Sequence, residues 1–145
     1  MKGFLLFIFA AGSIWDFVTS LLGIIGIFGV TDWKPEHIPI YISAFIGSAL
    51  ILGLSSNAEE IWSKSGNDKY KILIPFHIIA IAFDAYTSFL GTSQNVLLRD
   101  SRTAFITIGL GEVWEMTTFE QKIALLFVTV LVTMSPIAFS TLRDT

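Results

Sequence analysis

The sequence contains no cysteine, which excludes disulfide bonds, thiolate metal sites and thiol-based catalysis together. Charged residues are also scarce, at 14% of the chain, compared with about 25% in a typical soluble domain. They give a net charge of −3 and form no basic block, so no feature indicates nucleic-acid binding. The chain that remains is 53% hydrophobic, with a mean hydropathy of +0.70. These values are typical of a membrane protein.

Four long apolar runs account for this composition. They cover residues 4–30, 38–56, 72–98 and 123–142. Each is long enough to cross a hydrocarbon core about 30 Å thick as a helix. The first run begins like a secretory signal peptide, but it continues well past Gly12, which favours a spanning helix. We predict an all-α membrane protein with four transmembrane helices in a single domain over residues 1–145.

The segments between the runs are too short to form a soluble domain. In the connection 57–71 we expect a capping box from Ser56 to Glu59 and a short amphipathic turn, Asn57–Lys64, at the lipid headgroups. The longer connection 99–122 contains an apolar piece that is too short to span and is expected to be interfacial or re-entrant. Two overlapping capping boxes, beginning at Thr117 and Thr118, predict the start of the last helix.

The connections also bear on how the chain is oriented in the membrane. An even number of spans places both termini on one side. That side carries five Lys and Arg residues against four on the other, and its lysines at 64, 69 and 71 are compact and close to the spans. Because such residues favour the cytoplasmic side, we predict cytoplasmic termini.

An internal repeat connects the first and third runs. Residues 16–23 and 84–91 are identical at five of eight positions, in the pattern D-x-x-T-S-x-L-G. We therefore predict a duplicated two-helix unit, with copies over residues 4–56 and 72–142. Each copy has an even number of spans, so the two helical hairpins should be parallel and related by an axis along the membrane normal.

A helical period of 3.6 residues places the small and polar residues of each copy along one face. In the first run this face carries Gly12, Asp16, Thr19, Ser20 and Gly23, and in the third it carries Asp84, Thr87, Ser88, Gly91 and, two turns earlier, His77. Small residues allow helices to approach closely, and hydroxyls can bond a buried carboxyl, so both faces should be directed toward protein. The expected partners on the second and fourth runs are Ser43, Gly47, Thr129, Thr133 and Ser140.

Asp16 and Asp84 are the only charged residues inside the four runs. An ionised aspartate at mid-membrane costs about 2.5–3.5 kcal/mol on insertion scales, so such residues are rare unless they are paired or functional. The functional interpretation is a site in which the two carboxyls share a proton or hold a cation. The structural interpretation is that each carboxyl is protonated and bonded to a neighbouring Thr or Ser as a helix clamp. The sequence leaves both open.

Other chemistry is weakly indicated. Paired aspartates on two helices suggest an intramembrane aspartyl protease, but the sequence lacks a GxGD-type signature, and we expect no enzyme. Asp32, Glu36 and His37 form a crude metal constellation that we interpret as a solvated turn. Glu112 and Glu115 are interpreted in the same way, as part of a solvated loop. No pattern predicts a metal or a cofactor.

Three functions therefore compete. The first is an ion or proton pathway that uses Asp16 and Asp84 and is completed by oligomerisation. The second is an accessory subunit whose polar helix faces pack against other subunits of a larger membrane complex. The third is an effector that permeabilises the membrane. In each case the lipid bilayer is a partner, together with other copies of the chain or other membrane subunits.

Overall fold

The computed structural model of the protein describes residues 1–30, 32–64, 66–94 and 109–144. The regular structure in this part of the chain is helical. The elements are α1 (Lys2–Ile27), the 3-10 turn η1 (Pro35–His37), α2 (Ile38–Ser56), α3 (Ala58–Ser63), α4 (Asp68–Lys71), α5 (Leu73–Thr92), α6 (Leu110–Met116) and α7 (Phe119–Asp144). Four of them, α1, α2, α5 and α7, are long and apolar enough to cross a membrane. The predicted all-α membrane fold is confirmed.

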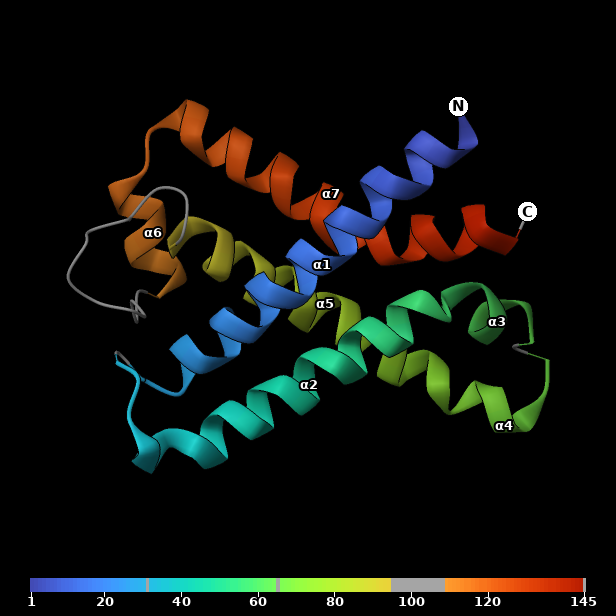
Figure 1. The fold of residues 1–145 in the computed structure, drawn as a ribbon, viewed down its shortest axis with the longest axis horizontal. Helices are drawn as coiled ribbons and strands as arrows, with labels where there is room; N and C mark the ends of the chain where they lie inside the picture. The colour runs from blue at the N-terminus through green and yellow to red at the C-terminus, as the bar shows by residue number, and fades with distance from the viewer. Residues whose placement is uncertain (31, 65, 95–108, 145) are drawn as a thin grey trace.

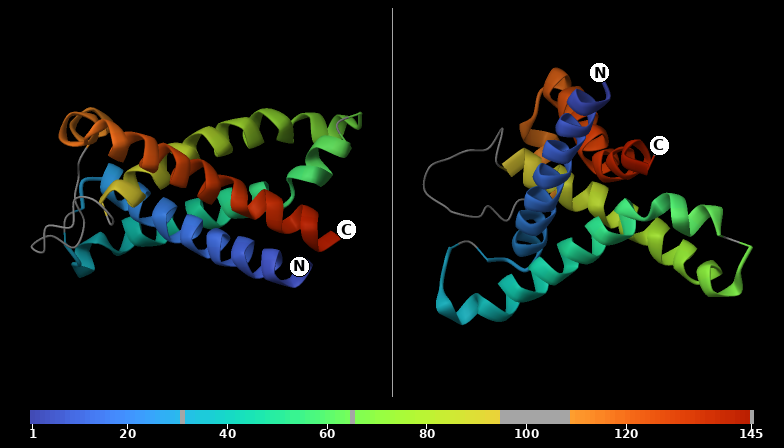
Figure 2. Two further views of the ribbon diagram at one scale, coloured as in Figure 1. Left: turned by 90° about the horizontal axis from the view of Figure 1, so that it is seen from above. Right: turned by 45° about the vertical axis from the view of Figure 1, so that its right-hand side comes forward.

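The four long helices run roughly along a common axis and form two helical hairpins, α1–α2 and α5–α7 (Figure 1). α1 and α5 run in one direction and cross near the middle of the molecule, whereas α2 and α7 run in the opposite direction. Both termini lie at the end that also carries α3 and α4, and the α1–α2 connection and α6 lie at the other end (Figure 2, left). Both termini therefore lie at the same end of the molecule, as an even number of spans requires.

The helix bounds differ from the apolar runs for local reasons. α2 matches its run, but α1 ends at Ile27, because Gly29 adopts a φ of 75° that stops the helix. α5 ends at Thr92, and residues 95–98 of the predicted run lie outside the described residues. The same holds for residues 99–108 of the predicted interfacial connection, of which the described part forms α6 and the start of α7.

The capping predictions have different outcomes. At the start of α7, the Thr118 N–H donates to Gln121 Oε1 at 2.9 Å and the Gln121 N–H donates to Thr118 Oγ1 at 3.3 Å, which confirms that capping box. The predicted box at Ser56 is wrong, because Ser56 is still the last residue of α2 and Asn57 takes the cap position. The Asn57 side chain donates instead to the Gly53 carbonyl at 2.7 Å.

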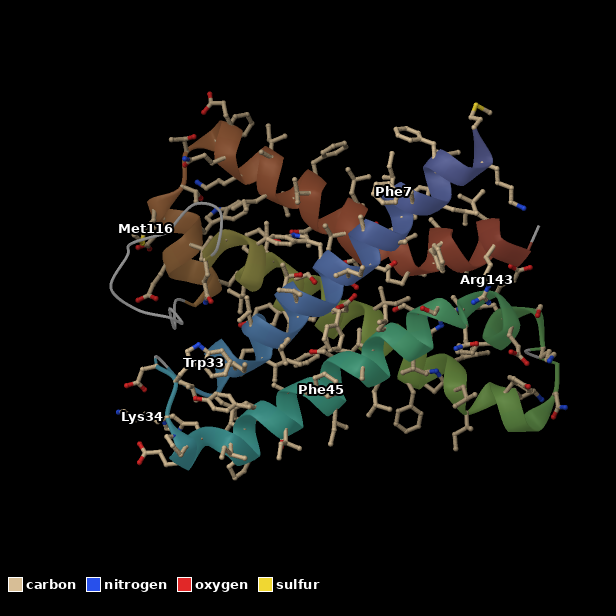
Figure 3. The ribbon with its side chains drawn as sticks, viewed as in Figure 1. Phe7, Trp33, Lys34, Phe45, Met116 and Arg143 are labelled. Carbon is tan, nitrogen blue, oxygen red and sulfur yellow. The ribbon has the colours of Figure 1, made fainter. Side chains whose placement is uncertain are left out.

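Apolar side chains cover the outside of the helices, and many buried side chains are polar. Phe7 and Phe45 point away from the bundle and are 71% and 56% exposed (Figure 3). Lys34 and Arg143 lie at opposite ends, beyond the apolar surface (Figure 3). In water this surface would be unfavourable, whereas in a bilayer it faces lipid chains of matching polarity. The distribution agrees with an integral membrane protein.

α7 contains Pro136, which the sequence predicts to kink the last helix. Figure 1 shows α7 changing direction in its C-terminal half, where this proline lies. The missing N–H removes one helical hydrogen bond, which lets the end of α7 turn relative to its first half.

The topology can be tested by labelling single cysteines, since the chain has none of its own. Asn67→Cys lies in the exposed connection at the end with the termini, and Glu115→Cys lies on exposed α6 at the other end. We expect a membrane-impermeant maleimide to reach the two cysteines from opposite faces of sealed vesicles. Labelling of both from one face would contradict the four-span arrangement.

Candidate functional site

Two glycines allow α1 and α5 to touch at their backbones. A Cβ atom on Gly23 would overlap the backbone carbonyl of Thr87, and one on Gly91 would overlap that of Thr19. The two contacts are reciprocal, because each glycine of one helix packs on the threonine of the other. Such an approach brings the polar faces of both helices within hydrogen-bonding distance.

Each aspartate is hydrogen bonded by a serine of the opposite helix. Ser88 Oγ donates to Asp16 Oδ1 at 3.0 Å, and Ser20 Oγ donates to Asp84 Oδ1 at 2.5 Å. The two serine oxygens are themselves 3.1 Å apart. The site therefore consists of a continuous row of four oxygen atoms across the α1–α5 crossing.

The threonines extend this pattern on both sides. Thr19 Oγ1 lies 3.1 Å from Ser88 Oγ, and Thr87 Oγ1 lies 3.1 Å from Ser20 Oγ. Each threonine is also 3.1 Å from the backbone carbonyl of the aspartate three residues before it. The threonine hydroxyls thus hold the serines in place and have carbonyls of their own helix as alternative acceptors.

The site is closed from solvent and has no cationic partner. Asp16 is 1% exposed and Asp84 is fully buried. The two carboxyl groups are joined through the two touching serine hydroxyls, and within the described residues neither forms a salt bridge. Asp84 Oδ2 is buried with no hydrogen-bond partner in this part of the chain. Two ionised carboxylates would be costly here, so the chemistry suits a bound proton or a small cation.

The predicted packing residues on the other helices are partly correct. A Cβ on Gly12 would overlap the Ser135 side chain of α7, and one on Gly47 would come within 3.3 Å of Ile24 Cδ1. Thr129 and Thr133 are buried, and Ser140 is buried and donates to the Ile137 carbonyl. Ser43 is exposed, so its predicted role as an interior partner is wrong. The buried face of α2 instead carries Ala44, Ser48, Ile51 and Ser55.

His77 lies on the same buried face of α5 as Asp84, as its spacing predicts. Its Nδ1 accepts a hydrogen bond from Trp62 Nε1 of α3 at 3.1 Å, and its Nε2 is buried without a partner in the described residues. α3 is further held by Glu60, whose pKa is lowered by hydrogen bonds from Lys64 and Tyr70. The Trp62–His77 hydrogen bond joins α3 to α5 at the end of the bundle.

The sequence repeat does not predict several of the buried polar residues. Ser48, Ser55 and Thr92 are buried with hydroxyls that lack partners in the described part of the chain. The sequence also does not predict the contact between Trp62 and His77, because the two residues belong to different helices and no helical period relates them. Periodicity assigned α2 a polar face one position away from the one it buries.

Two cavities lie at opposite ends of the bundle. One, of about 270 Å³, is at the end with the termini, and the other, of about 290 Å³, is at the far end. The first is lined by Ser56, Asn57, Glu59, Glu60, Ser63, Ser140 and Arg143. The second is lined by Gly26, Ile27, Gly29, Tyr86, Leu90, Gln94 and Gly109.

The surface candidates lie apart from this interior site. His37 Nε2 is 3.9 Å from Asp32 Oδ1 and 3.8 Å from Glu36 Oε1, while Lys34 pairs with Asp32 at 3.0 Å. Glu112 accepts from the Gly109 N–H at 3.1 Å at the start of α6. These contacts stabilise local structure at the end of the bundle opposite the termini.

Comparison with known proteins gives no match to a family model, a curated protein or a solved structure. The chemistry of the site is therefore interpreted from the residues of this chain.

The backbone contact can be tested by adding a single methyl group. We expect Gly23→Ala and Gly91→Ala each to lower the free energy of unfolding by about 1–3 kcal/mol, because a Cβ forces the helices apart. Gly53→Ala on α2 is the matched control, since its Cβ would meet open space. Thermal unfolding in mild detergent measures the difference, and equal melting temperatures for all three variants would contradict a tight α1–α5 crossing.

Proposed function

We propose that this protein is a small integral membrane protein that carries protons or small cations, with Asp16 and Asp84 as the binding centre. One observation carries the proposal. Two buried carboxyl groups from different helices meet in a row of hydroxyls, and the described residues supply no positive charge to neutralise them.

The need for a neutralising species follows from solvation. A carboxylate loses most of its favourable hydration inside a membrane protein, and hydroxyl donors replace only part of it. A second carboxylate beside the first adds repulsion that a low dielectric does not screen. The centre is therefore stable only with at least one proton or a cation bound, which is the property that a transport site needs.

Buried polar groups on both sides of the centre support a route through the bundle. Toward the far end, buried Thr92 follows Ser88 of the centre in the sequence and precedes Gln94, which lines the cavity there. Toward the termini, His77 lies two turns of α5 from Asp84, and Ser55 is adjacent to Ser56 of the other cavity. Several of these groups lack hydrogen-bond partners among the described residues, which suits water or a passing ion.

A structural role is the second candidate, and the serine donor that each aspartate finds on the opposite helix favours it. Each aspartate already has a serine donor within the same chain, as a neutral helix clamp requires. In that case the protein would act as an accessory subunit of a larger complex, and ionisation of the aspartates would have no role. The two candidates differ in their dependence on charge.

Each aspartate has its serine donor within one chain, so this pairing does not need a second copy. We retain two predictions that the network leaves open: association with other copies or subunits, and cytoplasmic termini. Native mass spectrometry in mild detergent measures the first. The accessibility of Asn67→Cys in intact cells measures the second, with labelling from outside the cell contradicting it.

Transport is tested in vesicles that contain the purified protein and a pH-sensitive or cation-sensitive dye. We expect wild type to dissipate an imposed gradient, and Asp16→Asn and Asp84→Asn to fall to the level of empty vesicles, because asparagine keeps the shape but cannot ionise. Asp32→Asn is the control, since it removes a carboxylate that is 48% exposed and outside the spans.

The same variants distinguish the structural role from the transport role. If the aspartates are neutral clamps, the asparagine variants should remain folded and no variant should differ from wild type in flux. Wild-type protein that moves neither protons nor Na⁺, K⁺ or divalent ions would overturn the transport proposal.

A further inference from the structure

The two serines connect the two aspartates, because each successive pair of side-chain oxygens lies within hydrogen-bonding distance. The order of the oxygens is Asp16 Oδ1, Ser88 Oγ, Ser20 Oγ and Asp84 Oδ1, and the successive separations are 3.0, 3.1 and 2.5 Å. Each separation is short enough for one proton between the two oxygens. Three contacts in the row therefore require three protons.

Counting protons shows what the row lacks when both aspartates are ionised. Each serine then donates its one proton to its aspartate, and the contact between Ser20 and Ser88 has none. The threonine hydroxyls cannot supply it, because each donates its proton along its own contact with a serine and not between the two serines. Two oxygen lone pairs would face each other at 3.1 Å inside the protein, which is unfavourable.

One added proton satisfies every contact. With a proton on Asp16, its carboxyl donates to Ser88, Ser88 donates to Ser20, and Ser20 donates to ionised Asp84. With the proton on Asp84, the same row runs in the opposite direction. A cation placed within this row would have to separate oxygens that are already in contact, whereas a proton fits between them without moving any of them.

We propose that the centre binds a single proton and that Ser20 and Ser88 pass it between Asp16 and Asp84. The transfer is balanced: the O–H bond of Asp16 breaks as a new one forms on Ser88. Ser88 gives its own proton to Ser20, and Ser20 gives its own to Asp84. No charge is left on either serine. This inference rests on the proposed function for its role in transport, and it names the cargo and the two relay residues.

The experiment resolves the two carboxyl groups by ¹³C NMR of aspartate-labelled protein in lipid at neutral pH, with assignments from Asp16→Asn and Asp84→Asn. In wild type we expect both signals to lie between the protonated and ionised positions, because one proton exchanges between them. Ser20→Ala removes the donor to Asp84, so the Asp84 signal should move to the protonated position and that of Asp16 to the ionised one. Ser88→Ala should give the mirror image.

The control is Ser48→Ala, which removes a hydroxyl that is equally buried but has no partner in the described residues. It should leave both signals unchanged. Ser20→Cys and Ser88→Cys provide second variants of similar size with a weak donor, in case the alanine variants do not fold.

Three results would overturn the inference. Two protonated carboxyls would indicate independent clamps, and two ionised carboxyls would indicate a bound cation. Signals that shift in neither serine variant would indicate direct transfer between the aspartates. None of these readouts depends on flux, so a protein that transports nothing can still show the shared proton, and one that transports Na⁺ can fail to show it.

Discussion

The backbone contact between α1 and α5 is the constraint on which the rest of the structure depends. Gly23 and Gly91 permit it, and no other residue type would leave room for the opposing threonine carbonyls. Only at this separation can a serine of one helix reach the aspartate of the other. Without the glycines, both carboxyls would lie in an apolar environment with only their own helix as a partner. The close approach and the polar chemistry are therefore one feature.

The crossing also explains why the interior is polar. In a bilayer the hydrophobic effect does not drive helices together, since lipid chains are as apolar as leucine. Association has to come from close packing and from hydrogen bonds that lipid cannot offer. The buried faces accordingly carry many Ser, Thr and Gly residues beside a few apolar ones such as Ile25 and Phe89, while many other Phe, Ile and Leu side chains face outward. A hydroxyl row at the centre meets this requirement, and the same row supplies the hydrogen bonds to the two carboxyls of the proposed proton site.

Much of this could be predicted from sequence, because hydropathy and helical period are local properties. They identified the spans, the repeat and the faces that carry Asp16 and Asp84. They could not give the crossing geometry, in which each aspartate meets the serine four positions further along the other copy rather than its own equivalent. That offset depends on the angle at which two backbones touch. Ser43 was misplaced for a related reason, since a short stripe on a uniformly apolar helix does not fix its rotation.

The repeat is close to symmetric at the centre and departs from symmetry around it. The serine, threonine and glycine contacts are reciprocal, so the two positions of a shared proton would be nearly equal in energy. Thr19 has a further contact with the Trp15 carbonyl at 3.0 Å, and His77 is present on α5 alone, since Phe9 stands at the corresponding place in α1. A difference of about 1.4 kcal/mol would shift the two populations tenfold. Contacts of this size around the row would therefore bias a shared proton toward one aspartate while both positions stay populated.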